Sequence, residues 1–216
     1  MNRQEEQDDK VTGVIFKKGK NFSCNNVGGK RKKSDFYQTP PILTKLLLDN
    51  VKLAGSILEP AYGFGAITKV LSNYGYSFEA YDLNVDPKQD FLKEKRHFDT
   101  IITNPPFSIA YQFIQHAKKI CDEFYFLLPL SYLHGKKRYD HIYTDKTFPL
   151  NKVWIFTRYP MLTDTLRSDG LVETGMIVYA WMQFTKGYQG KSTIEWLDVD
   201  PYIYRKNSEK KSLKQT

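Results

Sequence analysis

The stretch from Ser56 to Tyr74 constrains the fold more than any other part of the 216-residue chain. It predicts a short apolar strand that runs into a tight turn, with glycines at positions 63 and 65, and then a helix over 66–74. Glycine tolerates positive φ and lets a ligand approach the backbone closely. Strand, glycine turn and helix in this order are typical of the ligand-binding crevice of an open α/β sheet.

The remaining apolar patterns extend this α/β alternation. Thr39 is a candidate helix N-cap, with Pro40 at the first helical position. The run at 123–128 is so apolar that we expect a central strand. The other expected elements are helices at 42–51 and 108–120, strands at 77–81, 99–103, 152–157 and 175–184, and an edge strand at 193–197.

Asp82 stands at the end of the second expected strand. Its distance from the glycine turn suits a carboxylate that accepts hydrogen bonds from both hydroxyls of a ribose. An ordinary loop aspartate is the alternative. Gly65 is followed by Ala66 and Ile67, whereas the dinucleotide fingerprint continues to a third glycine, so the turn disfavours NAD.

A stiff elbow follows the strand at 99–103, in the order Asn104-Pro105-Pro106-Phe107. Each proline fixes its own φ and lacks an N–H, and Pro106 pushes Pro105 toward an extended conformation. The side-chain carbonyl of Asn104 and the backbone carbonyl of Pro105 can then point the same way, beside the ring of Phe107. Two acceptors next to an aromatic plane suit a planar amino group on a ring. A proline-rich turn without function is the alternative.

Taken in order, the motifs resemble those of the S-adenosylmethionine-dependent amino-methyltransferases, over roughly residues 36–184. The matching motifs are Tyr37-x-Thr39-Pro40, Glu59-Pro60-Ala61-x-Gly63-x-Gly65, Asp82, Asn104-Pro105-Pro106-Phe107 and the terminal hairpin. The order is similar to the gamma arrangement, and small phage-type adenine-N6 DNA methyltransferases are the nearest likeness. The resemblance implies a Rossmann-like class I methyltransferase fold: a seven-stranded, mostly parallel sheet, a C-terminal antiparallel hairpin and helices on both faces.

The resemblance also implies roles for individual residues. Asn104, Pro105, Pro106 and Phe107 would be catalytic, and the cofactor would be S-adenosylmethionine, without a metal. Asp90 would take the amino group of the cofactor adenine, and Phe91 would pack on its ring. The implied cofactor-binding set is Tyr37, Thr39, Pro40, Glu59, Pro60, Ala61, Gly63, Gly65, Asp82, Leu83, Asp90, Phe91 and Asn104.

For the substrate, an adenine in DNA is the first expectation. Adenine or guanine amino groups in RNA, and a catalytically inactive nucleic-acid-binding subunit, are the alternatives. Phe107 and Tyr159 would form the walls of a base pocket. Lys136, Lys137 and Arg138 would grip a phosphate backbone, unless they form a solvated helix face. Sequence specificity would be low, would be built into the loop at 158–174 or would be lent by a partner chain, and a homodimer is the other expected assembly.

The net charge of +8 resides at the two ends of the chain. Residues 1–33 carry +5 and residues 200–216 carry +3, while the segment between them is neutral. We expect a basic N-terminal arm (1–33), a catalytic domain (34–199) and a basic tail (200–216). Basic ends favour a polyanionic partner such as nucleic acid, although they can also merely aid solubility. The polar N-terminus and the absence of a long apolar run favour a cytoplasmic protein, bacterial or in a phage-infected cell, without a membrane partner.

Overall fold

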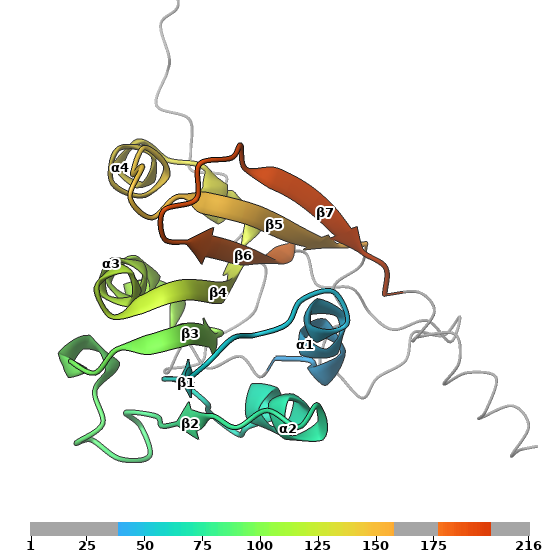
Figure 1. Ribbon diagram of the computed structural model, residues 1–216, viewed down its shortest axis with the longest axis vertical. Helices are drawn as coiled ribbons and strands as arrows, with labels where there is room; N and C mark the ends of the chain where they lie inside the picture. Colours follow the sequence, from blue (N-terminus) through green and yellow to red (C-terminus); the bar gives the residue numbers. More distant parts are fainter. Residues whose placement is uncertain (1–38, 158–176, 200–216) are drawn as a thin grey trace, which may run out of the picture. The chain divides into compact units, whose positions relative to one another are not determined.

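The computed structural model describes residues 39–157 and 177–199, which are organised around one seven-stranded sheet (Figure 1). In the sheet the strands lie in the order β2-β1-β3-β4-β6-β5-β7. Neighbouring strands are parallel, except that β6 is antiparallel to both β4 and β5. The predicted mostly parallel sheet with an antiparallel hairpin is therefore confirmed. The strands are β1 (Ile57–Glu59), β2 (Glu79–Ala80), β3 (Phe98–Thr103), β4 (Cys121–Pro129), β5 (Leu150–Phe156), β6 (Tyr179–Thr185) and β7 (Thr193–Leu197).

Helices cover both faces of the sheet, as predicted. α1 (Pro41–Leu48) and α2 (Ala66–Asn73) bury their apolar side chains on one face, and α3 (Ala110–Ile120) buries its own on the other. α4 (Lys136–Arg138) is a single short turn. The remaining short helical turns are η2 (Phe91–Lys93), η3 (Phe107–Ile109), η4 (Leu130–Leu133) and η5 (Tyr139–Tyr143), of which η5 is π-helical.

β4 is the central strand, and its sequence explains why. Its side chains alternate between the two faces: Phe124, Phe126 and Leu128 join the core under α3, whereas Tyr125 and Leu127 join the core under α1 and α2. All five are buried. Burying one large apolar side chain stabilises a fold by about 1.5–3 kcal/mol, so this strand anchors both cores.

Two local predictions need correction. Thr39 does not cap α1, because the helix begins at Pro41 and Pro40 occupies the N-cap position; the hydroxyl of Thr39 accepts a hydrogen bond from the side-chain amide of Asn104. The second strand is limited to Glu79–Ala80 because only these residues pair with β1. Both differences arise from contacts with distant parts of the chain.

The predicted arm at 1–33, the loop at 158–174, the tail at 200–216 and the residues Tyr37 and Tyr159 lie outside the described residues. The domain boundaries therefore stay predictions. Within 39–157 and 177–199, no helix combines the length and the apolar character needed to cross a bilayer. The same residues contain no cluster of three or more histidine, cysteine, aspartate or glutamate side chains able to hold a metal ion.

Candidate active site

The predicted motifs meet at one edge of the sheet. β2, β1, β3 and β4 are parallel neighbours, so their carboxyl ends lie at the same edge. After β1 the chain places β2 on one side of it and β3 on the other, which makes the β1–β3 junction a topological switch point. Ligands of open α/β sheets bind in the crevice outside the strands at such a point. The glycine turn follows β1, Asp82 follows β2 and Asn104 follows β3.

The glycine turn has a conformation that other residues adopt with strain. Gly63 and Gly65 have φ values of 55° and 75°, in the left-handed region. A Cβ atom on Gly65 would lie 2.9 Å from the hydroxyl oxygen of Thr68. The N–H of Gly65 donates to the carbonyl of Tyr62 over 2.7 Å, which closes the turn directly before α2. The two glycines therefore shape the backbone on which a ligand would rest.

Asp82 braces this turn from the neighbouring strand. Its side chain is buried, and its Oδ2 accepts a hydrogen bond from the N–H of Gly63 over 2.9 Å. Its Oδ1 accepts from the N–H of Asn84 over 2.8 Å. An ionised carboxylate has about four acceptor positions, so two contacts leave capacity for ligand hydroxyls. Leu83, the next residue, has 46% of its surface exposed.

Glu59, at the end of β1, has a buried carboxyl group with incomplete hydrogen bonding among the described residues. It is 1% exposed, and its Oε2 has no hydrogen-bond partner among the described residues. Burial raises the pKa of the Glu59 carboxyl well above its usual range, and the negative charge of Asp82 raises it further. The backbone N–H of Thr68 opposes this rise. A buried acceptor left without a donor costs about 1–3 kcal/mol, and such groups call for a functional explanation.

The elbow after β3 is held by contacts from distant parts of the chain. The side-chain amide of Asn104 donates to the hydroxyl of Thr39 over 3.1 Å, which ties the end of β3 to the start of α1. The ring of Phe107 stacks on that of Tyr179, with centroids 5.4 Å apart and an angle of 29° between the planes. Pro105 is buried, and η3 begins directly after Pro106.

Tyr179 was not singled out from the sequence. The available signal was the expected hairpin: the strand that contains Tyr179 runs antiparallel to β4, so its first residues lie at the edge where β4 ends. Tyr179 pairs there with Pro129. The other expected aromatic wall, Tyr159, lies outside the described residues.

Asp90 and Phe91 lie at the start of η2, the short helical turn between β2 and β3. Phe91 is 2% exposed and packs in the core, with its centroid 4.6 Å from that of Phe113. Asp90 caps η2 by accepting from the N–H of Leu92, and it pairs with Lys93 over 3.3 Å. Phe91 thus lies in the core, whereas the carboxylate of Asp90 is partly exposed, and the contacts of both residues with a cofactor adenine stay predictions.

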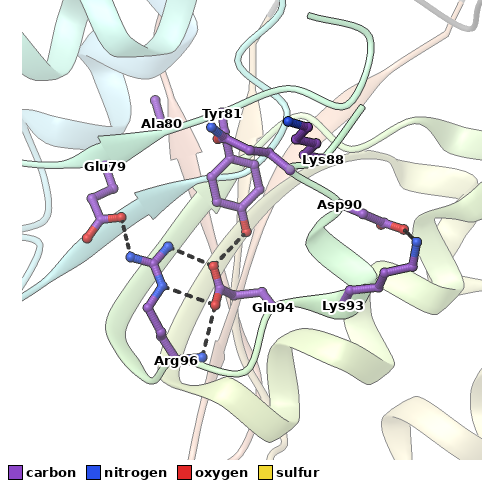
Figure 2. Close-up of a pocket in the computed structure, with 9 residues that line it drawn as sticks. Glu79, Ala80, Tyr81, Lys88, Asp90, Lys93, Glu94 and Arg96 are labelled. Carbon is purple, nitrogen blue, oxygen red and sulfur yellow. Dashed lines mark hydrogen bonds and ion pairs between the residues drawn. The ribbon is translucent and has the colours of Figure 1, made fainter. Parts of the chain in front are cut away.

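Asp90 lines a cavity of about 610 Å³ at the β2 edge of the sheet (Figure 2). Arg96 bridges Glu79 and Glu94 there, and the hydroxyl of Tyr81 points to Glu94. Hydrogen bonds from Arg96 lower the pKa of Glu94 to about 2. Neither Asp82 nor Asn104 lines this cavity, so it is distinct from the crevice at the switch point.

The three basic residues after β4 differ in their contacts. Arg138 donates to the backbone carbonyls of His134 and Ser131, so its guanidinium holds the turn together. Lys136 pairs with Asp140 over 2.5 Å. Lys137 lies over the ring of Tyr111, 4.5 Å from its centroid. The sequence predicts one role for all three residues, whereas their contacts in the structure differ.

Comparisons with known proteins agree on the fold. Neither protein-family models nor curated protein sequences match the chain. Solved structures do match. A proposed class I S-adenosylmethionine-dependent methyltransferase from Listeria monocytogenes aligns with a TM-score of 0.55 at 14% identity, over 83% of this chain and 72% of that one.

Two further structures align less well. A proposed RNA methyltransferase from Pyrococcus horikoshii has a TM-score of 0.49 at 15% identity, over 76% of this chain and 95% of that one. The modification subunit of a proposed type I restriction enzyme from Vibrio vulnificus has a TM-score of 0.49 at 16% identity, over 78% of this chain and 48% of that one. The sheet order and the likeness to the Listeria protein together show that this chain has the class I S-adenosylmethionine-dependent methyltransferase fold.

Proposed function

We propose that this chain is an S-adenosylmethionine-dependent methyltransferase that methylates the exocyclic amino nitrogen of adenine in DNA. One observation carries the proposal: motifs that are separated along the sequence follow three adjacent parallel strands and meet at one edge. A glycine turn, two buried carboxyl groups and the Asn104 elbow thereby surround the switch point of the sheet. Any turn after β3 would lie at this edge, so the proposal is supported by the combination of the three motifs there and not by the place of the elbow alone.

The residues at the crevice fit the proposed cofactor. Its ribose presents two hydroxyls, which the carboxylate of Asp82 can accept. The ammonium group of its methionine part can donate to Glu59, whose buried Oε2 lacks a donor among the described residues, and its positive charge would lower the raised pKa of this carboxyl. The glycine turn lets the cofactor approach the backbone between them. When bound, S-adenosylmethionine supplies an electrophilic methyl group.

The elbow fits the proposed acceptor. An exocyclic amino nitrogen is a weak nucleophile because its lone pair is delocalised into the ring. Hydrogen bonds from its two N–H groups to the carbonyl oxygens of Asn104 and Pro105 would favour a pyramidal nitrogen with an available lone pair. These oxygens would also stabilise the positive charge that develops as the nitrogen gains a methyl group, before it loses a proton.

The aromatic part of the elbow would position the base. Phe107 already stacks on Tyr179, so its ring is held at a fixed angle at the edge of the site. A target base that leaves its stack could regain stacking energy against such a ring. Fixed alignment of the amino nitrogen supplies much of the rate in a transfer of this kind.

The choice of a nucleic acid rests on charge and on the motif order. The chain carries +8, and the excess of positive charge is located at its two ends. DNA is chosen over RNA because of the basic ends and the likeness to small phage-type enzymes, since an Asn-Pro-Pro-Phe elbow also serves the methylation of RNA bases. Protein amides also present a planar amino group, so the experiment must distinguish methylation of protein from methylation of nucleic acid.

The test is incubation of the purified chain with methyl-labelled S-adenosylmethionine and, in parallel, single-stranded DNA, duplex DNA, RNA and a protein mixture. We expect label in DNA, and digestion to nucleosides should identify N6-methyldeoxyadenosine. Label in RNA alone would transfer the proposal to RNA bases. Binding of the cofactor without label in any of the four would contradict methyl transfer as the function.

A further inference from the structure

A surface rich in tyrosine and basic residues lies beside the elbow. β4 ends at Pro129, and η4, α4 and η5 follow without a gap. Because β3 lies between β1 and β4, this segment is on the opposite side of the elbow from the glycine turn. α3 starts at the same edge, and Tyr111 is in its first turn, four residues after Phe107. The surface is therefore on the side of the elbow that the cofactor crevice leaves open.

Three cation–ring contacts organise this surface. Lys137 lies 4.5 Å from the ring centroid of Tyr111, and Lys136 lies 5.6 Å from that of Tyr139. Arg138 lies 4.6 Å from the ring centroid of Tyr132. Cations and aromatic faces in alternation are the elements of proteins that bind single-stranded nucleic acid.

The structure shows which members are available to a ligand. Arg138 and Tyr132 are part of the scaffold: Arg138 donates to backbone carbonyls, and the carbonyl of Tyr132 accepts from the hydroxyl of Tyr143 over 2.9 Å. Lys136 is neutralised by Asp140. In the part of the chain that the structure describes, Lys137 has no acidic partner, and Tyr139 has 58% of its surface exposed. Lys137, which lies over the ring of Tyr111, and the exposed ring of Tyr139 are therefore the members left for a ligand.

We propose that Tyr111, Lys137 and Tyr139 form a platform that holds single-stranded DNA next to the target base. This inference rests on the proposed function and adds the form of the substrate. Lys137 would contact a phosphate, and the rings of Tyr111 and Tyr139 would stack on neighbouring bases. Stacked pairs in a duplex bury their faces and cannot use such rings, so the platform favours a strand that is already unpaired.

The experiment measures the affinity of the full chain for a dye-labelled oligonucleotide by fluorescence anisotropy, in three forms: single-stranded DNA, the same sequence as a duplex, and RNA. The variants are Tyr111→Ala, Tyr139→Ala and Lys137→Ala, with Tyr111→Phe and Tyr139→Phe to preserve the rings. Tyr74→Ala is the matched control, because Tyr74 also lies under a lysine, at 5.7 Å from Lys45, but at the far end of α2. Circular dichroism verifies that each variant is folded.

We expect single-stranded DNA to bind more tightly than duplex or RNA. Each tyrosine-to-alanine change should weaken that binding about tenfold, within the range for loss of one stacked base, and each phenylalanine variant should bind like the wild type. Lys137→Ala should reduce the slope of log affinity against log salt by about 0.7, the value for one phosphate contact on a single strand. Tyr74→Ala should change neither quantity.

Unchanged binding in folded Tyr111→Ala and Tyr139→Ala would overturn the platform. Equal losses on single strand and duplex would overturn its preference for unpaired DNA, and tighter binding of RNA would overturn the choice of DNA. Methyl transfer by the same wild-type preparation is measured alongside. If the wild type transfers methyl groups but DNA binding does not depend on the two tyrosines, only the platform is overturned. If the wild type transfers no methyl groups, the proposed function is overturned, and the binding measurements alone decide on the platform.

Discussion

The two sides of the elbow are built differently. On the β1–β2 side, the carboxyl groups of Glu59 and Asp82 are buried and contact backbone N–H groups. On the β4 side, the groups of the proposed platform are side chains that contact other side chains: Lys137 lies over the ring of Tyr111, and Lys136 lies over that of Tyr139. Backbone contacts in a buried setting couple binding to folding, whereas surface side chains can change with little effect on the core. Substitutions on the two sides should therefore differ in kind.

The largest effect should come from the elbow that lies between the two sides. Asn104→Ala removes one of the two proposed acceptors for the amino group, and loss of one such group typically lowers kcat by 10²–10³-fold. We expect at least a 10²-fold loss of transfer, larger than any increase in the dissociation constant for the cofactor, measured by label transfer and calorimetry. Asn73→Ala, at the end of α2, is the control. Retained turnover in Asn104→Ala would remove the amide from the mechanism.

On the cofactor side, Asp82→Ala should weaken cofactor binding. Hydrogen bonds to a charged group contribute about 1.5–3 kcal/mol each, so loss of two ribose contacts predicts an increase of about 100-fold or more in the dissociation constant. Asp86→Ala is a matched control, because Asp86 also accepts a backbone N–H, that of Lys88, in the same loop. Calorimetric titration with S-adenosylmethionine measures both. An equal dissociation constant in the two variants would show that the ribose contact is misplaced.

A pH series should separate Glu59 from ordinary carboxylates. Because burial raises its pKa in the folded state, the folded protein holds this proton at pH values where the unfolded chain has lost it. The associated stability is fully present below the unfolded pKa of about 4.3 and is lost as the pH rises through the raised pKa. Glu59→Gln removes this loss, so the melting temperature of the variant relative to wild type should increase as the pH rises above about 4.3 toward the raised pKa of Glu59. A difference that stays constant with pH would contradict the raised pKa.

The smallest effect should come from the β2-edge cavity. Arg96 bridges Glu79 and Glu94 at the surface, with 56% of its side chain exposed, and exposed ion pairs contribute about 0–1 kcal/mol. Arg96→Ala should therefore lower the free energy of unfolding by less than about 1 kcal/mol at neutral pH, without changing cofactor affinity. The lowered pKa of Glu94 means that this contribution disappears as the pH falls toward about 2. Urea unfolding at two pH values measures it, and a large loss of cofactor affinity would place the cofactor in this cavity.

The sequence predicts the fold well where the signal is local. A few consecutive residues are enough to predict each of the glycine turn, the elbow and the apolar strand β4. The structure has the corresponding elements where they are expected. Contacts between distant segments were not predictable. The local pattern predicts that Thr39 caps a helix. Its hydroxyl instead accepts a hydrogen bond from the side-chain amide of Asn104, which is 65 positions away in the sequence.

The same limit applies to the direction in which a side chain points. The resemblance predicts that Phe91 packs on a cofactor ring, but it does not predict the contact of Phe91 with Phe113 of α3 in the core. The cluster Lys136–Arg138 was recognised from its charge, but charge alone could not show that Arg138 holds a turn while Lys137 lies over a ring. Burial and partner choice depend on the assembled sheet.

The most direct test is a crystal structure of the chain with S-adenosylhomocysteine and a short single-stranded oligonucleotide that contains adenine. We predict the ribose of the ligand on Asp82, its amino-acid end near Glu59 and the glycine turn, and the adenine amino group within hydrogen-bonding distance of Asn104 and Pro105. A ligand seated in the β2-edge cavity, or an elbow that faces away from the bound ligand, would contradict the account.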